Sequence, residues 1–179
     1  MTKSFQIRTA GADAADQLTQ LAERTFRDTF SKDNAPEDMA VYLREAFTVG
    51  RIRSELESDA NTFLVAFANA DEPIGYAKLR TDRTPASVTG STPIELERLY
   101  VDQRWIGCGV GSRLIQASLD TAQALGCQTI WLGVWEKNAR AIAFYQKWGF
   151  EVVGTHVFVL GADHQRDYTM ARSVNDGAV

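Results

Sequence analysis

The segment IGCGVGS, residues 106–112, decides the fold of this chain. Residues 94–101 before it read as a β-strand, and residues 110–125 after it show the apolar period of an amphipathic helix, which Gly126 would end. A second apolar strand follows at 129–134. Two strands joined by a crossing helix pair in parallel within one sheet. The glycine-rich segment is therefore predicted to be the turn from strand to helix in a β-α-β unit.

Further strands and helices are predicted on both sides of this unit. Upstream, the sequence pattern predicts strands at 5–8, 62–67 and 74–80 and helices at 13–28, 36–47 and 49–57. Downstream, it predicts a helix at 138–148 and a closing hairpin at 151–160 and 166–171. Together these elements predict an α/β (α+β) fold built on a mixed sheet, and they exclude a doubly wound sheet.

Individual residues predict where the elements begin and end. Asp13 is expected to cap the first helix, and Pro36 is expected in the first turn of the second. Gly149 should end the last helix. Residues 69–72 should form the turn of the first hairpin, and residues 81–92 an exposed loop.

The composition is that of an ordinary globular protein. Of the 179 residues, 45% are apolar and 23% are charged, so a single domain over 1–179 is expected. The net charge of −4 argues against nucleic-acid binding, because such binding relies on cations that neutralise phosphates. No apolar run approaches the ~20 residues of a membrane span, and residues 1–10 show no signal peptide.

The cysteines and histidines do not indicate a metal site or a disulfide framework. Cys108 and Cys127 are too few for such a framework, and no Cys/His cluster has zinc spacing. Reduced thiols, no metal and a cytoplasmic location are therefore expected. His156 and His164 are expected on the surface or in a turn rather than in catalysis.

The alternating glycines of the 106–112 segment suit an anion. They leave the backbone bare, so that amide N–H groups at a helix N-terminus can converge on a phosphate. The alternative is a tight turn that binds no ligand. The segment is not a Walker loop, because no Gly-Lys-Ser/Thr follows, and the apolar residues 132–134 lack the acidic residue of a dinucleotide fingerprint.

A second motif sharpens this interpretation. In NARAIAFYQKWGF, residues 138–150, Asn138 and Tyr145 are two helical turns apart and share a face. The Gly-x-Gly-x-Gly turn followed by Asn-x-x-Ala-x-x-Phe-Tyr-x-x-x-Gly-Phe resembles the GCN-five-related N-acetyltransferases, the GNAT family, over residues 94–150. The resemblance implies a mostly antiparallel sheet flanked by helices, with one parallel strand pair splayed apart, and an enzyme that uses acetyl-CoA.

A finer resemblance concerns the acceptor. Residues 25–30 (TFRDTF), 36–39 (PEDM) and 131–138 (WLGVWEKN) are similar to the bacterial Pai-type spermidine/spermine N-acetyltransferases. This similarity favours a polyamine as the acceptor amine. The alternatives are an enzyme for a protein N-terminus, an amino acid or an antibiotic amine, and a regulatory protein that binds acyl-CoA without turnover. The expected partner is a small-molecule amine, and the protein could be a monomer or a homodimer.

The GNAT resemblance also implies a set of coenzyme-binding residues. Leu99, Tyr100 and Val101 would offer backbone groups to the pantetheine arm. The other expected contacts are Ile106, Gly107, Cys108, Gly109, Val110, Gly111, Ser112, Asn138, Tyr145 and Lys147. Asn138 could equally be a plain N-cap. Ile106 departs from the family pattern, which has Arg or Gln there; the residues that could compensate are Arg104, Arg113 and Lys147.

Acetyl transfer from a thioester to an amine requires two proton movements. An alkylammonium, with a pKa of about 10.4, must lose a proton, and a leaving thiolate, with a pKa of about 8.5, must gain one. The family resemblance places Tyr145 as the proton donor. The alternative for Tyr145 is aromatic packing on the sheet. Cys108 is not expected to act as a nucleophile, because no histidine is placed to activate it.

Two glutamates are candidates for the base. The two-residue period of a strand puts Glu95 and Glu97 on one face, together with Leu99 and Val101. The family resemblance implies a glutamate base at either position; Glu97, which matches the polyamine-acetylating members best, is the first choice and Glu95 the second. The alternative is a solvated edge or a salt bridge to a neighbouring arginine, Arg80 or Arg98.

The acceptor site is expected at the first two helices and the loop between them. The family resemblance places the acceptor there, and the polar and aromatic candidates are Asp28, Phe30 and Asn34, together with Glu97. Phe26, by contrast, is expected to be a core residue.

Overall fold

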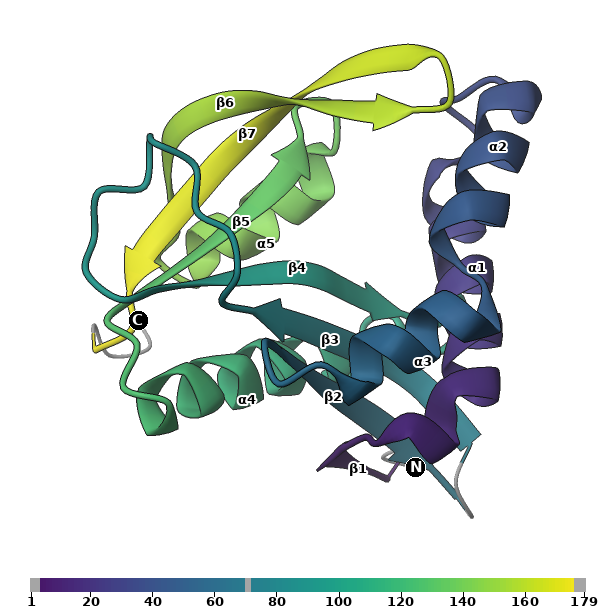
Figure 1. Ribbon diagram of the computed structural model, residues 1–179, viewed down its shortest axis with the longest axis horizontal. Coiled ribbons are helices and arrows are strands. Elements are labelled where there is room, and N and C mark those ends of the chain that lie inside the picture. The colour runs from purple at the N-terminus through teal and green to yellow at the C-terminus, as the bar shows by residue number, and fades with distance from the viewer. Residues whose placement is uncertain (1–3, 70–71, 176–179) are drawn as a thin grey trace.

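The computed structural model describes residues 4–69 and 72–175. In these residues the chain forms one seven-stranded sheet covered by helices (Figure 1). The strands are β1 (Phe5–Thr9), β2 (Asn61–Ala68), β3 (Glu72–Arg80), β4 (Pro93–Val101), β5 (Thr129–Trp135), β6 (Glu151–Leu160) and β7 (Asp163–Ser173). The helices are η1 (Ala12–Ala14), α1 (Ala15–Phe30), α2 (Pro36–Ala46), α3 (Val49–Glu57), η2 (Gln103–Trp105), α4 (Val110–Ala124) and α5 (Ala139–Lys147).

The sheet has the order β1-β2-β3-β4-β5-β7-β6. Strands β1 to β4 pair antiparallel, as do β5, β7 and β6, whereas β4 and β5 pair parallel. Helix α4 makes the crossover between these two strands, as the sequence predicts. The predicted α/β class with a mixed sheet is therefore confirmed. Of the turn expected at 69–72, Ala70 and Asp71 lie outside the described residues.

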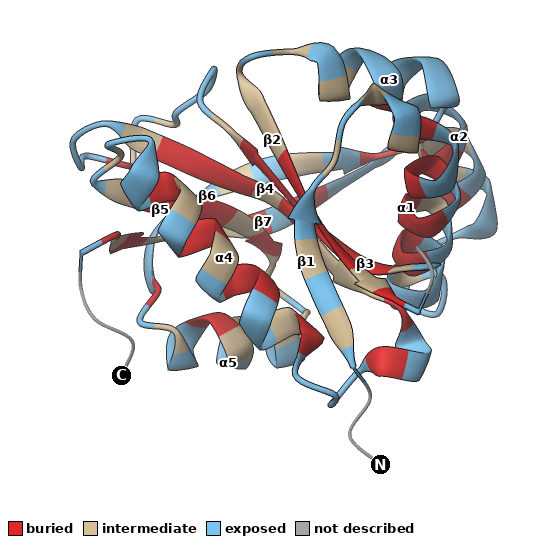
Figure 2. Cartoon of the chain, turned by 90° about the horizontal axis from the view of Figure 1, so that it is seen from below, coloured by how far each residue is buried: buried red, intermediate tan, exposed pale blue. Residues whose placement is uncertain are grey.

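Helices cover both faces of the sheet. Seen from below in Figure 2, α4 and α5 lie on one side and α1, α2 and α3 on the other. Leu114 and Ile115 of α4 belong to the core cluster on the first side, and Leu18 and Leu21 of α1 to the cluster on the second. None of the helices in residues 4–69 and 72–175 is long and apolar enough to cross a membrane.

The helix ends follow the sequence signals with one exception. Pro36 begins α2, and Gly126 and Gly149 adopt φ of 75° and 80° just beyond the ends of α4 and α5, as predicted. Asp13 does not cap the first helix. It lies inside the 3-10 turn η1, and α1 begins behind Ala14 without a side-chain cap. The preceding turn already satisfies part of the backbone, because Ala14 N–H donates to Gly11 O.

A β-bulge interrupts β4 and corrects the predicted face of its glutamates. Arg98 pairs with Lys78 on β3, but the next rung joins Leu96 to Leu79, so Glu97 has no partner there. The extra residue reverses the alternation of side chains. Leu99 and Val101 therefore pack in the core on the α4 side. Glu97 lies on the opposite side, where its carboxylate contacts Lys78.

The parallel pair separates after three rungs. Residues 93–95 of β4 pair with residues 129–131 of β5, ending at Glu95 and Trp131. Beyond them, β4 continues against β3 and β5 continues against β7. The two strands thus diverge, which confirms the splayed pair that the family resemblance implies. The edges that face each other in the splay have no strand partner in residues 4–69 and 72–175, so their backbone groups can accept a ligand.

Candidate active site

A cavity of about 1100 Å³ opens at the splay between β4 and β5. Its walls come from these two strands and the end of β3, from α1, α2 and α3, from the first turn of α4, from α5, and from the β6–β7 hairpin. Leu99, Tyr100 and Val101 line it along the unpaired edge of β4. A volume of this size is at the upper end of small-molecule sites.

The glycine loop forms one end of the cavity. Gly107 and Gly109 adopt φ of 80° and 84°, a left-handed conformation that residues with a Cβ rarely take. Gly109 is also the N-cap of α4, so the bare amides at this helix N-terminus face the cavity. Gly107, Gly109, Gly111 and Ser112 all line it, together with exposed Ile106.

Two predicted contacts in the loop lie elsewhere. Cys108 is an exposed free thiol outside the cavity lining, and Val110 is buried in the core. The loop turns at the two left-handed glycines, so alternate residues point away from the cavity. Any contribution of Cys108 or Val110 to the site is therefore restricted to the backbone.

The three cations expected to compensate for Ile106 do not line the cavity. Arg104 Nη2 lies 2.9 Å from Asp102 Oδ2 and 3.0 Å from Glu72 Oε1. The Arg113 guanidinium lies over the Phe5 ring. Lys147 is exposed at the end of α5. The structure instead places Arg140 in the cavity lining, in the first turn of α5.

Asn138 and Tyr145 both line the cavity from α5. Asn138 is the N-cap of the helix: its Oδ1 accepts a hydrogen bond of 3.1 Å from Ala141 N. Tyr145 is buried, and its ring makes edge contacts with Phe144 and Phe150. Burial raises the pKa of Tyr145, so its phenol stays protonated at neutral pH.

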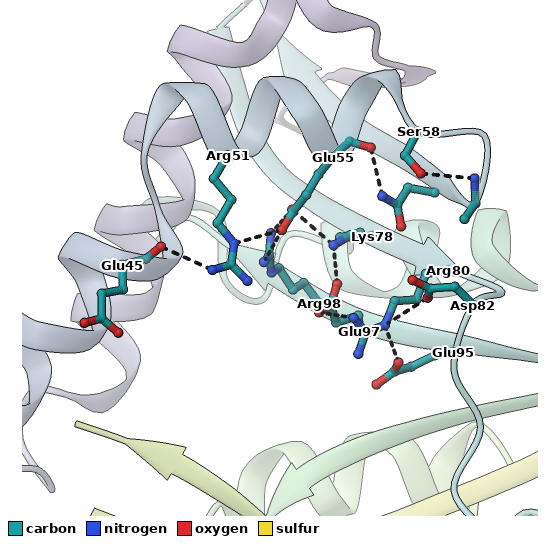
Figure 3. A network of polar contacts seen from close by, with 12 residues as sticks. Glu45, Arg51, Glu55, Ser58, Lys78, Arg80, Asp82, Glu95, Glu97 and Arg98 are labelled. Atoms are coloured by element: carbon teal, nitrogen blue, oxygen red, sulfur yellow. Dashed lines mark hydrogen bonds and ion pairs between the residues drawn. The ribbon is translucent and has the colours of Figure 1, made fainter. Parts of the chain in front are cut away.

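Glu95 and Glu97 lie at the base of a network of ion pairs (Figure 3). Arg80 bridges the two carboxylates: its Nε is 2.5 Å from Glu95 Oε2, and its Nη1 is 3.0 Å from Glu97 Oε1. Lys78 Nζ lies 2.5 Å from Glu97 Oε2. Burial raises the pKa of Glu95, although Arg80 opposes this. The sequence left a solvated edge or a salt bridge with Arg80 or Arg98 as the alternative to a base role, and the structure shows the salt bridge with Arg80.

The network continues to α3. Glu55 Oε2 lies 2.8 Å from Arg98 Nη1 and 3.1 Å from Lys78 Nζ, so one carboxylate of the helix binds cations of two neighbouring strands. Arg51 of the same helix lies 3.3 Å from Glu55 Oε1. The floor beneath Glu95 and Glu97 is therefore neutralised by fixed partners rather than left as a free acidic surface.

The acceptor side of the cavity is largely aromatic. Asp28 and Phe30 line it, and Phe26 is 2% exposed in the core, as expected. Phe26 lies 4.6 Å, centroid to centroid, from both Phe30 and Tyr42. Asn34 does not line the cavity. Its side chain donates to Phe30 O and accepts from Gln165, which joins the α1–α2 loop to β7.

Several residues of the cavity wall were not expected from the sequence. His156 is half-buried on β6 and Asp167 is buried on β7, and both line the cavity. The expectation that His156 lies on the surface or in a turn is therefore wrong. The two residues are direct partners across the β6–β7 hairpin. Their alternation with apolar residues was visible in the sequence, but the register that pairs them was not.

Comparison with known proteins assigns this geometry to a family. The profile of the acetyltransferase (GNAT) family matches residues 15–150. The chain belongs to the GNAT acetyltransferase family. It is 33% identical over 159 residues to an uncharacterized N-acetyltransferase in the pepI 3′ region of Lactobacillus delbrueckii subsp. lactis, covering 88% of this chain and 91% of that protein.

Two further matches are a polyamine acetyltransferase and the structure of a PaiA protein. A spermine/spermidine N(1)-acetyltransferase of Bacillus subtilis is 35% identical over 60 residues, which are 33% of this GNAT chain and 40% of that protein. The crystal structure of the PaiA N-acetyltransferase of Thermoplasma acidophilum with coenzyme A superposes with a TM-score of 0.78 at 23% identity, over 95% of this chain and 99% of that one. This second likeness concerns the fold.

Proposed function

We propose that this GNAT protein transfers the acetyl group of acetyl-CoA to a primary amine of a small molecule. One observation carries the proposal. A single cavity joins the bare amides at the N-terminus of α4, the Tyr145 phenol and the paired carboxylates Glu95 and Glu97. Acetyl transfer needs these three features together: an anion site for the coenzyme, a proton donor for sulfur and a polar site for a cation.

The fit of acetyl-CoA rests on the splay and on the loop. The unpaired edge of β4 at residues 99–101 has the hydrogen-bonding groups that the amides of a pantetheine arm require. The amides around Gly107 and Gly109 suit the pyrophosphate, and Arg140 adds a positive charge nearby. When bound, the coenzyme supplies the activated acetyl group, and the chain supplies orientation and proton transfer.

Tyr145 is proposed as the general acid. Its raised pKa keeps the proton on the phenol until a stronger base than a carboxylate appears nearby. A departing thiolate is such a base. The hydrophobic contacts with Phe144 and Phe150 hold the ring in one orientation, so the hydroxyl position is set by packing.

Glu95 and Glu97 are proposed to hold the incoming ammonium. Both carboxylates already bind Arg80, and Glu97 also binds Lys78. A carboxylate that already binds cations is a weak proton acceptor, but its remaining lone pairs can accept hydrogen bonds from an ammonium. The base role predicted for Glu97, with Glu95 as second choice, stays a prediction, and these ion pairs favour a binding role.

A polyamine is the acceptor suggested by the Pai-type resemblance and by the partial match to the Bacillus enzyme. The charges of the cavity do not select a polycation over a singly charged amine. Its lining includes five carboxylates and six cationic side chains. The carboxylates are Asp28, Glu45, Glu95, Glu97 and Asp167, and the cations are Lys32, Arg51, Arg80, Arg83, Arg98 and Arg140. On the resemblance and the partial match alone, spermidine and spermine head the list of acceptors to test, and single amines are tested beside them.

Thiol release from acetyl-CoA in the presence of separate amines tests the proposal. The panel contains spermidine, spermine, a monoamine, an amino acid, a peptide with a free N-terminus and an aminoglycoside. We expect amine-dependent thiol release with at least one small-molecule amine, and mass spectrometry should find the matching amide. Binding of acetyl-CoA without amide formation from any of these amines would contradict the proposal and would favour a regulatory acyl-CoA-binding protein.

A further inference from the structure

A histidine and an aspartate lie on the β5–β7–β6 side of the cavity, away from the glutamates of β4. His156 on β6 pairs directly with Asp167 on β7, and both side chains line the cavity. Side chains that pair directly across two strands point to the same face. His156 Nε2 is 4.0 Å from Asp167 Oδ2, close enough for the carboxylate to stabilise a proton on the ring.

Gly133 of β5 lets the imidazole reach the splay. A Cβ at Gly133 would lie 2.7 Å from Cε1 and 2.9 Å from Nε2 of His156, so the ring fills the space that a side chain would need. Trp131, the last β5 residue that pairs with β4, is two residues earlier and points to the same face. The imidazole therefore lies where the two strands begin to separate, beside the proposed position of the thioester.

The opposite ring nitrogen of His156 has a fixed partner. Nδ1 is 2.9 Å from Oγ1 of Thr169, which is fully buried on β7. When Nδ1–H donates to this hydroxyl, Nε2 keeps its lone pair and is free to accept a proton. Asp167 Oδ1 is buried and accepts no hydrogen bond from the described part of the chain. A positive charge on the imidazole would offset the cost of that buried oxygen.

Burial, together with the charge of Arg83, keeps His156 neutral before it acts. Burial and then Arg83, in the loop between β3 and β4, lower the pKa of His156. Burial and then Glu136, just after β5, raise the pKa of Asp167 to about 7. Glu136 is itself paired with Arg166, with 2.6 Å between Oε2 and Nη2. At neutral pH the imidazole is therefore unprotonated and available as a base.

We propose that His156 takes the proton from the acceptor ammonium, positioned by Thr169 and Asp167. The inference rests on the proposed amine acetylation. The ammonium gives one proton to Nε2, and the freed nitrogen lone pair forms the C–N bond to the acetyl carbonyl carbon. The C–S bond breaks, and its electron pair leaves on sulfur, which takes the phenol proton of Tyr145. The second proton lost by nitrogen returns to the tyrosinate through water, and His156 releases its proton to solvent.

His156→Gln, assayed with the best amine of the panel, tests this role. Removing a general base should lower kcat/KM about 10²–10⁴-fold at pH 7. The loss should shrink as the pH approaches about 10, where the free amine is abundant without help. The affinity for acetyl-CoA should not change. His164→Gln is the matched control, because His164 is exposed on β7 outside the cavity lining, and it should keep the wild-type pH profile.

Two further measurements separate a base from a structural residue. Asp167→Asn should lower kcat/KM more at pH 8, where the wild-type carboxylate is ionised and stabilises the imidazolium, than at pH 6, where that carboxyl is already protonated. In the wild type, the His156 Cε1–H resonance should titrate below the ordinary histidine value of about 6.5. A ring that stays protonated over the active pH range would overturn the proposal, even if His156→Gln did not fold.

The outcomes for the two proposals are distinct. Wild-type rates for His156→Gln at pH 7, or a loss of the same size at every pH, would contradict the base role alone. A wild type that acetylates no amine would contradict the proposed function and the role of His156 with it. A pH-dependent loss confined to His156→Gln, with the His164→Gln control unaffected, would support both.

Discussion

At the scale of single residues, the acid role proposed for Tyr145 makes the most specific prediction. Tyr145→Phe keeps the ring, with its contacts to Phe144 and Phe150, and removes only the proton donor. We expect kcat to fall about 10²–10⁴-fold with little change in the affinity for acetyl-CoA, measured by titration and steady-state kinetics. The defect should persist at high pH, because it concerns the thiolate and not the amine. Near-wild-type rates at every pH would refute the acid role.

Glu97 and His156 are distinguished by the pH dependence of their variants. If Glu97 holds the ammonium, Glu97→Gln should raise KM for the amine roughly 10- to 100-fold, the cost of a lost charged hydrogen bond, and the rise should be similar between pH 7 and about pH 9, where the amine stays protonated. Glu37→Gln, an exposed change in the first turn of α2, is the control. A fall in kcat with KM unchanged, already shrinking between pH 7 and about pH 9, would instead make Glu97 the base.

The sequence predicted residues in local motifs and missed those that depend on register. Tyr145 and Asn138 follow from a helix motif read along one face. His156 and Gly133 come together only through the pairing of β6 with β7 and of β7 with β5, which no local pattern contains. Asn34 shows the converse: its position near the acceptor helices suggested a substrate contact, but its side chain is used to hold Gln165.

At the scale of elements, the glycine turn before α4 tests the anion site. Gly109→Asp places a negative charge where the phosphates are expected, whereas Gly109→Asn has the same shape and no charge. Both side chains tolerate left-handed backbone, and a Cβ at Gly109 meets no atom within 4 Å, so both variants should fold. Isothermal titration should show acetyl-CoA binding weakened about tenfold or more by Asp relative to Asn. Equal affinities of the two variants for acetyl-CoA would contradict the proposal that this turn binds the phosphates.

Asp102 joins the end of β4 to α1 and to the turn η2. Its carboxylate accepts hydrogen bonds from Arg104 Nε at 3.0 Å and from Arg24 Nη2 at 3.1 Å. The hydrogen bond from Arg104 lowers the pKa of Asp102 from 3.8 to about 2. A lowered pKa stabilises the fold above the ordinary value, and this stabilisation is lost as the pH falls through the lowered one.

Asp102→Asn should therefore be less stable than the wild type by about 1–2 kcal/mol at pH 7, allowing for solvent around the exposed Arg104. The difference in free energy of unfolding should disappear as the pH falls from about 4 to about 2. Urea titrations at several pH values measure it. Asp59→Asn, an exposed change after α3, should show no such trend. A difference that stays constant between these pH values would contradict the role of the carboxylate charge.

The bulge in β4 limits what a strand pattern can predict. The two-residue alternation of side chains correctly predicted a strand at 94–101, but it wrongly predicted that Glu97 shares a face with Leu99. One unpaired residue reverses that alternation, and a bulge depends on the partner strand rather than on the bulged sequence. The same bulge turns Glu97 towards Lys78, so the element that misled the sequence pattern also shapes the site.

At the scale of the whole molecule, the order of elements was predictable. Strand, glycine turn, helix and strand fix a parallel crossover, and hairpins on both sides fix the antiparallel remainder. The position of α1 to α3 relative to the β6–β7 hairpin was not predictable from the sequence, because it depends on contacts between residues far apart in the chain. One is the hydrogen bond of 2.7 Å from Ala162 N to Asp38 Oδ1, which holds the hairpin turn against α2.

Ligand binding should stabilise the entire fold. Acetyl-CoA at about 100 times its Kd should add about 2.7 kcal/mol to the free energy of unfolding. For a chain of this size, that raises Tm by roughly 5–10 °C. Differential scanning fluorimetry with acetyl-CoA, NAD and ATP measures the effect. NAD and ATP, which lack the pantetheine arm, should give much smaller shifts. Equal shifts with ATP and acetyl-CoA would contradict the assignment of the splay to pantetheine.

The most direct single measurement is a crystal structure of the protein with coenzyme A. The pantetheine should lie between β4 and β5, with its amides bonded to the backbone of residues 99–101 and the pyrophosphate at the turn of Gly107 and Gly109. The thiol sulfur should lie within hydrogen-bonding reach of the Tyr145 hydroxyl. Coenzyme bound outside the splay, or a sulfur remote from Tyr145, would contradict acetyl transfer at this site.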